Sequence, residues 1–265
     1  MDEKRYTSKI IKVAAHISDA KIFLSEWNED LSSEENLDIF VQHNIFGKPS
    51  RMAVKNILLI FKERFLLGDD RDKALRRLVK ADVDQTIVNR ILYYHTTLAD
   101  KLLYDFVTKY LYGLYLKGDL LIFTKKAQEY IQKLSIEGKT VTPWSETVCN
   151  RVTLNILSTL RDFNLLEGKT KKKTTPPYLP TEAFVYIAYL LFHQNLSGEQ
   201  IINHEDWKLF LLDPSTVERM FIDAHQNGYL VYNAAGSIIR INFNFNNIEG
   251  IVDAIIERKA GITGV

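Results

Sequence analysis

Apolar side chains recur every three or four positions along most of this chain, which is the spacing of one face of an α-helix. The segment 145–163 shows the pattern in its stripe of Val148, Val152, Ile156 and Leu160. On this basis we predict helices at 8–27, 32–44, 51–67, 71–80, 84–94, 99–117, 123–134, 145–163, 181–193, 199–203, 205–211, 213–227 and 247–259. The fold class that follows is mostly α, a multi-helix bundle.

Residues at the helix boundaries support this prediction. Ser32 and Glu35 have the spacing of a capping box, and Ser145 is placed to cap the helix that follows it. Asp213 precedes Pro214, a residue that fits the first position of a helix. These positions indicate where three of the helices begin.

Two segments break the helical pattern. The first, 164–180, reads NLLEGKTKKKTTPPYLP, which predicts a short strand, a basic tip and a return strand. The second alternates as strands at 229–232 and 238–242 around the turn 233–236. Each hairpin follows a helix, and two further helices precede that helix. This is the order of a winged-helix-like module, a helix-turn-helix followed by a short β-hairpin.

We therefore predict three parts. An N-terminal helical domain covers 1–97, and a winged-helix-like module with a basic wing covers 98–180. A second winged-helix-like module with a C-terminal helix covers 181–265. The two modules share an order of elements rather than repeated residues. Winged modules place the last helix in the major groove of DNA and the wing beside the backbone.

The composition is that of a globular protein, with 46% apolar residues, 25% charged residues and a net charge of +1. A polyanionic partner must then be bound by a local patch. The single cysteine, Cys149, excludes a disulfide within the chain and favours a cytoplasmic location. The longest apolar run, 184–192, is shorter than the ~20 residues of a membrane span, so we expect no integral membrane insertion.

A local basic patch follows the helix at 145–163. We predict contact with double-stranded DNA through this helix and the first wing, at Ser145, Thr147, Asn150, Arg151, Asn155, Lys169, Lys171, Lys172 and Lys173. Asparagine and arginine hydrogen-bond base edges, and lysines neutralise phosphates. The alternative for the helix alone is an ordinary solvated face, which any surface helix presents. The lysines beside it favour the nucleic-acid interpretation.

Two other surfaces fit nucleic acid less well. The second module balances Arg219 and Arg240 against Asp213 and Glu218, which favours a structural or protein-binding role. Basic residues between 48 and 80 are partly offset by the acidic residues among them, so a solvated helix surface is the preferred interpretation, with a groove for a nucleic-acid backbone as the alternative.

Catalytic motifs fail on their own spacing, so we predict a protein that is not an enzyme and has no cofactor or metal. The two Gly-Lys-Thr tripeptides lack the first glycine of a phosphate-binding loop, because Lys133 and Phe163 occupy its positions. Asp162 with Glu167 and Lys169 resembles part of a nuclease site, but its first carboxylate lies at a helix end rather than a strand end. The six histidines lack zinc-ligand spacing.

Several packing and turn segments occur in an order that resembles one protein family. They are 38–50 (DIFVQHNIFGKPS), 61–65 (FKERF), 101–107 (KLLYDFV), 143–147 (PWSET) and 160–166 (LRDFNLL). Together they are similar to the BrxA proteins of BREX phage-defence systems, over residues 8–243.

The resemblance implies a small helical component, with winged-helix-like parts and no catalytic residues, that binds DNA and works with other BREX subunits. Members of the family are also described as inner-membrane proteins. The short apolar runs of this sequence do not support that location. The alternative function is a protein-interaction scaffold that docks other subunits of the defence complex, which the nearly neutral net charge favours.

Overall fold

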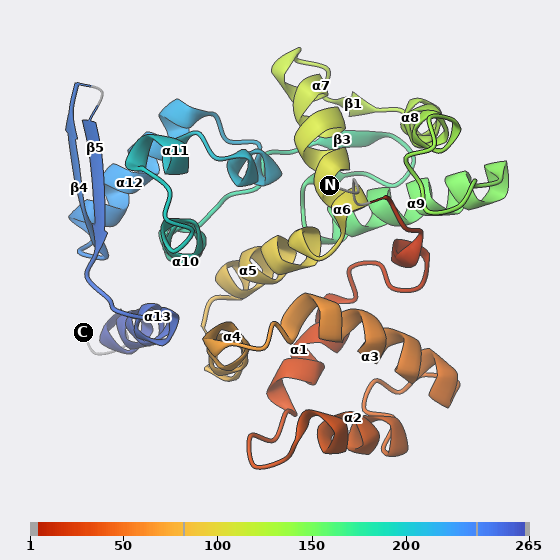
Figure 1. Cartoon of the computed structure of the whole chain (residues 1–265), viewed down its shortest axis with the longest axis horizontal. Coiled ribbons are helices and arrows are strands. Elements are labelled where there is room, and N and C mark those ends of the chain that lie inside the picture. Colours follow the sequence, from red (N-terminus) through yellow and green to blue (C-terminus); the bar gives the residue numbers. More distant parts are fainter. Residues whose placement is uncertain (1–4, 82, 237, 263–265) are drawn as a thin grey trace.

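The computed structural model describes residues 5–81, 83–236 and 238–262, and it confirms a mostly helical fold with short hairpins (Figure 1). The first part of the chain folds into a 3-10 helix (Lys9–Ile11), α1 (Ile17–Ser25), α2 (Ser33–Gln42), α3 (Arg51–Phe65), α4 (Asp70–Lys80) and α5 (Gln85–Leu98). Ser32 and Glu35 form the predicted capping box at the start of α2.

The helix predicted at 8–27 is not continuous. His16 has a φ of 47°, in the left-handed region, so the helical path is interrupted just before α1. Arg64 of α3 donates hydrogen bonds to the carbonyl oxygens of Val13 and Ala14 near this break, at 2.9 and 2.8 Å. Apolar spacing did not reveal the break because residues on both sides of it are buried.

The middle of the chain carries the first predicted hairpin. Its elements are α6 (Lys101–Asp105), a π-helical segment (Phe106–Leu111), α7 (Tyr112–Leu116), β1 (Leu121–Ile122), α8 (Thr124–Ile136), α9 (Glu146–Asp162), β2 (Leu166–Glu167) and β3 (Lys172–Thr174). Strands β2 and β3 form the hairpin, and β1 joins them in the antiparallel order β1-β3-β2. Strand β1 was not predicted, because two residues carry no periodic pattern.

The last part of the chain carries the second predicted hairpin. Its elements are α10 (Thr181–Phe192), α11 (Gly198–Ile202), a 3-10 helix (Glu205–Phe210), α12 (Pro214–Gln226), β4 (Leu230–Ala235), β5 (Ile238–Phe243) and α13 (Ile248–Ile262). Strands β4 and β5 pair antiparallel, from Leu230 opposite Phe243 to Ala235 opposite Ile238. They form a sheet of their own.

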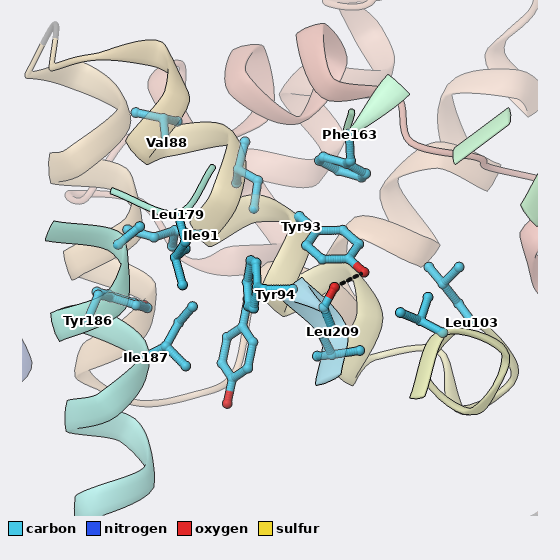
Figure 2. Close-up of a cluster of buried hydrophobic side chains, with 14 of the residues drawn as sticks. Val88, Ile91, Tyr93, Tyr94, Leu103, Phe163, Leu179, Tyr186, Ile187 and Leu209 are labelled. Carbon is cyan, nitrogen blue, oxygen red and sulfur yellow. Dashed lines mark hydrogen bonds between the residues drawn. The ribbon is translucent and has the colours of Figure 1, made fainter. Parts of the chain in front are cut away.

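Helix α5 lies at the centre of the molecule and contacts elements from all three predicted parts. It packs against α3, α6 and α10. Figure 2 shows its buried residues among those of α10 and of the segments around Phe163 and Leu179. The hydroxyl group of Tyr93 donates a hydrogen bond to the carbonyl oxygen of Leu209 at 3.0 Å. The middle and last parts of the chain are therefore held on one central helix.

Helix α13 returns to the N-terminal part, where it packs against α4 as well as α10 (Figure 1). Arg77 of α4 forms an ion pair with Asp253, and Nζ of Lys73 lies 3.2 Å from a carboxylate oxygen of Glu249. The buried apolar side chains form one core that crosses both predicted boundaries. The division into three parts stays a prediction about the order of modules.

Helix α10 contains the most apolar run of the chain. Most of its side chains are buried within the protein core. Across the described residues, no helix combines the length and the apolar character that crossing a membrane requires.

Candidate nucleic-acid interface

Helix α9 is amphipathic and exposes one face. The helix packs against α8 and β2, and its buried side chains include Cys149, Val152, Ile156 and Leu160. On the opposite side the exposed residues are Glu146, Thr147, Asn150, Arg151 and Leu154. Thr147, Arg151 and Leu154 are three or four positions apart, so they lie along one face of the helix.

The five predicted contact residues of this helix have different environments. Ser145 is the N-cap, and its Oγ accepts a hydrogen bond from the N–H of Val148 at 3.3 Å. Asn155 is half-buried, and its Nδ2 donates to the carbonyl oxygen of Arg151 at 2.8 Å. Among the described residues, no hydrogen bond engages the side chains of Thr147, Asn150 or Arg151. These three polar groups are available to a ligand.

Three of the four predicted lysines are exposed and one is not. Lys169 and Lys171 lie in the turn between β2 and β3, and Lys173 lies on the outer face of β3. Lys172 is only 9% exposed, and its Nζ donates a hydrogen bond to the carbonyl oxygen of Lys169 at 2.9 Å. Lys172 thus does not fit the predicted contact surface, because its ammonium group braces the turn from inside.

The burial of Lys172 follows from the alternation of side chains along a strand. Lys172 pairs with Ile122 of β1, which is buried. Lys173 pairs with Leu121, which is 53% exposed. Residues directly opposite each other on neighbouring strands share a face of the sheet. Consecutive lysines in a strand therefore cannot all face the solvent.

The turn of this hairpin depends on Gly168. Its φ of 88° is a conformation that favours glycine. A Cβ atom at this position would overlap the carbonyl oxygen of Lys171. Glycine is therefore required where the chain turns back, and the turn holds Lys169 and Lys171 beside the sheet.

Arg90 of α5 anchors both ends of the hairpin segment. Its side chain is buried, and its Nη1 donates to the carbonyl oxygen of Phe163 at 2.5 Å. Its Nε donates to the carbonyl oxygen of Tyr178 at 2.8 Å. Burial lowers the pKa of Arg90, yet an arginine stays charged in proteins. The sequence carried no sign of this role, because arginine is mostly exposed in folded proteins.

The candidate surface is positive. Among the described residues, no carboxylate lies within ion-pair distance of Arg151, Lys169, Lys171 or Lys173. Glu167 lies opposite Lys173 in the β2–β3 ladder and offsets part of its charge. Cations that lack partners are the groups that a phosphate backbone neutralises on binding.

The length of α9 determines how long a ligand must be to contact both ends of the candidate surface. Its 17 residues make a helix ~25 Å long. The hairpin begins at the C-terminal end of α9, after Asn164 in the left-handed conformation. A ligand that touches both Ser145 and the hairpin is therefore extended, and ~25 Å corresponds to about seven steps of a DNA duplex.

The reactive residue types near this surface are buried or already engaged. Cys149 is 1% exposed, and burial raises the pKa of its thiol. A carboxylate oxygen of Asp162 lies 3.2 Å from Nη2 of Arg161. In the part of the chain that the structure describes, no group of three or more His, Cys, Asp or Glu side chains is arranged to hold a metal ion.

The second hairpin differs from the first in charge. Segment 230–243 contains one basic residue, Arg240, and no lysine. On α12, Arg219 donates a hydrogen bond to Oγ1 of Thr216 at 2.9 Å, and Glu218 accepts one from the hydroxyl group of Tyr232 at 2.7 Å. The structural or protein-binding role of this module stays a prediction.

Comparison with known proteins gives a family match. The family model described as BrxA matches residues 4–190, which is more than half of the chain. No curated protein matches this chain.

Two solved structures are similar in fold, each at 11% sequence identity. One is the crystal structure of an uncharacterized protein from Magnetospirillum magneticum, with a TM-score of 0.61 over 78% of this chain and 100% of that chain. The other is magnesium ion-bound SspB, with a TM-score of 0.53 over 94% of this chain and 89% of that chain. At such low identity the likeness concerns the fold alone.

Proposed function

This chain belongs to the BrxA family of BREX phage-defence components, and we propose that within such a system it binds double-stranded DNA without catalysing a reaction. The observation that carries the proposal is the basic hairpin beside the exposed face of α9. Lys169, Lys171 and Lys173 are exposed there and have no carboxylate partner within ion-pair distance among the described residues. Asn150 and Arg151 are residue types that hydrogen-bond base edges.

The order of elements supports a winged module. Helices α6 and α7 precede β1, which is followed by α8, α9 and the β2–β3 hairpin. The return strand β3 lies at the centre of the sheet and pairs with β1. In winged modules the last helix enters the major groove and the wing lies beside the backbone. On this proposal α9 is the recognition helix and the β2–β3 hairpin, with its turn, is the wing.

Phosphate neutralisation supplies most of the binding free energy on this proposal. Each lysine that neutralises a phosphate releases a counterion, so the affinity falls as the salt concentration rises. Three lysines give a slope of about −2.7 in a plot of log K against log salt concentration. Arg151 steepens this slope if it also contacts a phosphate.

Charge reversal of the wing tests the proposal. The variant Lys169→Glu/Lys171→Glu/Lys173→Glu is expected to lose duplex affinity and most of the salt slope, measured by fluorescence anisotropy at several salt concentrations. The matched control is Arg51→Glu/Lys55→Glu/Lys62→Glu, which reverses three exposed cations of α3. Unchanged affinity and slope in the wing variant would show that the wing does not contact DNA.

Docking of another subunit is the second candidate function, and exposed apolar side chains of the last module favour it. Ile222 of α12 is 39% exposed, Val231 of β4 is 37% exposed and Ile238 of β5 is 61% exposed. Exposed apolar side chains of this kind serve protein interfaces when they form one patch. Co-purification with the other BREX subunits, with and without nuclease treatment, separates direct docking from a shared DNA tether.

A further inference from the structure

A pocket of about 340 Å³ lies beside the wing, at the outer edge of the three-stranded sheet. Its walls are contributed by the helical segment before β1, by β1 itself, by the start of α8 and by β3. The lining side chains that matter are Tyr110, Leu114, Leu121, Phe123, Lys126 and Lys173. This volume is at the small end of the ~300–1,000 Å³ range of ligand pockets, so the occupant is small or is one unit of a longer molecule.

The apolar part of the pocket is unusually exposed. Phe123 is 57% exposed and Leu121 is 53% exposed, while Ile122 between them is buried. This alternation places Leu121 and Phe123 on the same side of the chain. Tyr110 also lines the pocket, and the centroid of its ring lies 4.7 Å from that of Tyr130. The pocket thus combines an exposed aromatic ring, Phe123, with a second ring, Tyr110, that is held by packing on Tyr130.

Two cations flank the aromatic surface. Nζ of Lys126 lies 5.6 Å from the ring centroid of Phe123, and Lys173 lies opposite Leu121 in the β1–β3 ladder. Asp119 is the acidic residue in the lining. Neither lysine forms an ion pair within the described residues. An aromatic surface with a net positive border suits a ligand that carries both a flat ring and a negative charge.

We infer that this pocket accepts one unpaired nucleotide of DNA, with its base on Phe123 and its phosphate near Lys126 and Lys173. The inference rests on the proposed function, because Lys173 belongs to the wing that contacts the duplex on that proposal. Lys173 belongs to β3 and also lines the pocket, so the pocket adjoins the surface that contacts the duplex on that proposal. The preferred ligand is then a duplex with a single-stranded extension.

Binding of matched DNA molecules tests the inference. The full-length chain is titrated into a blunt duplex and into the same duplex with a three-nucleotide extension on one strand, for extensions of either polarity. Stacking of one base on an aromatic side chain gives a preference for one extended duplex of roughly 5- to 100-fold. A 2-aminopurine base in the extension changes its fluorescence when it stacks in the pocket.

Variants of Phe123 connect the preference to the pocket. Phe123→Ala removes the preference and leaves the affinity for the blunt duplex within about twofold, whereas Phe123→Trp keeps the preference because it keeps a stacking surface. The matched control is Ile136→Ala, which removes an apolar side chain that is 86% exposed at the other end of α8. This control keeps the preference.

The possible outcomes separate the two proposals. Absence of binding to every DNA contradicts the proposed function. Binding to blunt and extended duplexes with equal affinity contradicts only the pocket assignment, and so does a preference that survives Phe123→Ala. If Phe123→Ala leaves DNA binding unchanged and abolishes co-purification with another BREX subunit, the pocket binds a protein and the nucleotide assignment is overturned.

Discussion

Nη1 of Arg90 lies 2.5 Å from the carbonyl oxygen of Phe163. This oxygen belongs to the C-cap of α9, where the helix dipole leaves partial negative charge, so the buried guanidinium lies at a favourable place. Nε of the same side chain donates to Tyr178, beyond the hairpin. The two candidate DNA-contact elements are therefore positioned by a residue that belongs to neither of them.

Replacement of Arg90 should destabilise the protein. Arg90→Met removes the donor for two carbonyl groups, and we expect the free energy of unfolding to fall by roughly 2–3 kcal/mol. Urea denaturation followed by circular dichroism measures this change. The exposed Arg151→Met variant should stay within about 0.5 kcal/mol of the native protein. Equal losses in the two variants would mean that Arg90 does not anchor the hairpin.

The two hairpins offer a matched test of the wing turn. A side chain at Gly168 meets both left-handed strain and the carbonyl oxygen of Lys171, whereas Gly236 has a φ of 61° and open space around it. Gly236→Ala should lower the free energy of unfolding by about 1–2 kcal/mol through backbone strain alone. Gly168→Ala should lower it by more, because its side chain also meets the carbonyl oxygen. Only Gly168→Ala should also weaken duplex binding, as measured by anisotropy. A similar binding defect in both variants would contradict the role of this turn.

Neighbouring lysines should behave differently. Lys172 faces inward and Lys173 faces outward, so Lys172→Met should leave the salt dependence of duplex binding unchanged. Lys173→Met should reduce the slope by about 0.9, the value for one phosphate contact. Titrations at a series of salt concentrations measure both slopes. Equal reductions in the two variants would show that Lys172 leaves its buried position when DNA binds.

The stability of the protein should fall in mild acid because of His95. Nε2 of His95 lies 2.9 Å from the hydroxyl oxygen of Tyr186, and burial, with a smaller effect of Arg71, lowers the pKa of the imidazole to about 3. In the unfolded chain its pKa is about 6.5, so between these values the unfolded state binds the extra proton. The contribution of His95 to the free energy of unfolding is therefore complete above pH ~6.5. It is lost as the pH falls, by up to about 1.4 kcal/mol per pH unit.

Urea denaturation at pH 7, 6 and 5 checks this pH dependence. His95→Gln should have a shallower decline of the unfolding free energy than the native protein over this range, because the titrating group is gone. His43→Gln replaces an exposed histidine and should keep the native slope. The assignment is wrong if the His95 variant declines as steeply as the native protein.

The helices and both hairpins were predictable because their signals are local. The buried stripe of α9 and the caps at Ser32 and Ser145 are read from neighbouring residues. Strand β1 was not predictable, because its place in the sheet depends on pairing with a strand about fifty positions away. The left-handed conformation of His16 has the same origin, since it occurs at a break where Arg64 from a distant helix binds the backbone.

The candidate surface was predictable in outline only. Exposed polar residues on α9 and a basic turn follow from composition and order. The inward orientation of Lys172 depends on the strand register, and the anchoring role of Arg90 depends on where α5 lies. The exposure of Phe123 was not predicted, because an aromatic residue near the start of a helix usually packs in the core. The orientation of Lys172, the role of Arg90 and the exposure of Phe123 all depend on tertiary contacts.

The packing of α13 on α4 has a consequence for biosynthesis. Arg77 and Asp253, which pair across this contact, are 176 positions apart in the chain. At ~5–20 residues per second, a ribosome needs roughly 9 to 35 seconds to make the residues between them. During that time the side of α4 that receives α13 stays uncovered on the nascent chain. Completion of the fold therefore waits for translation, and this surface of α4 is open to chaperones in the meantime.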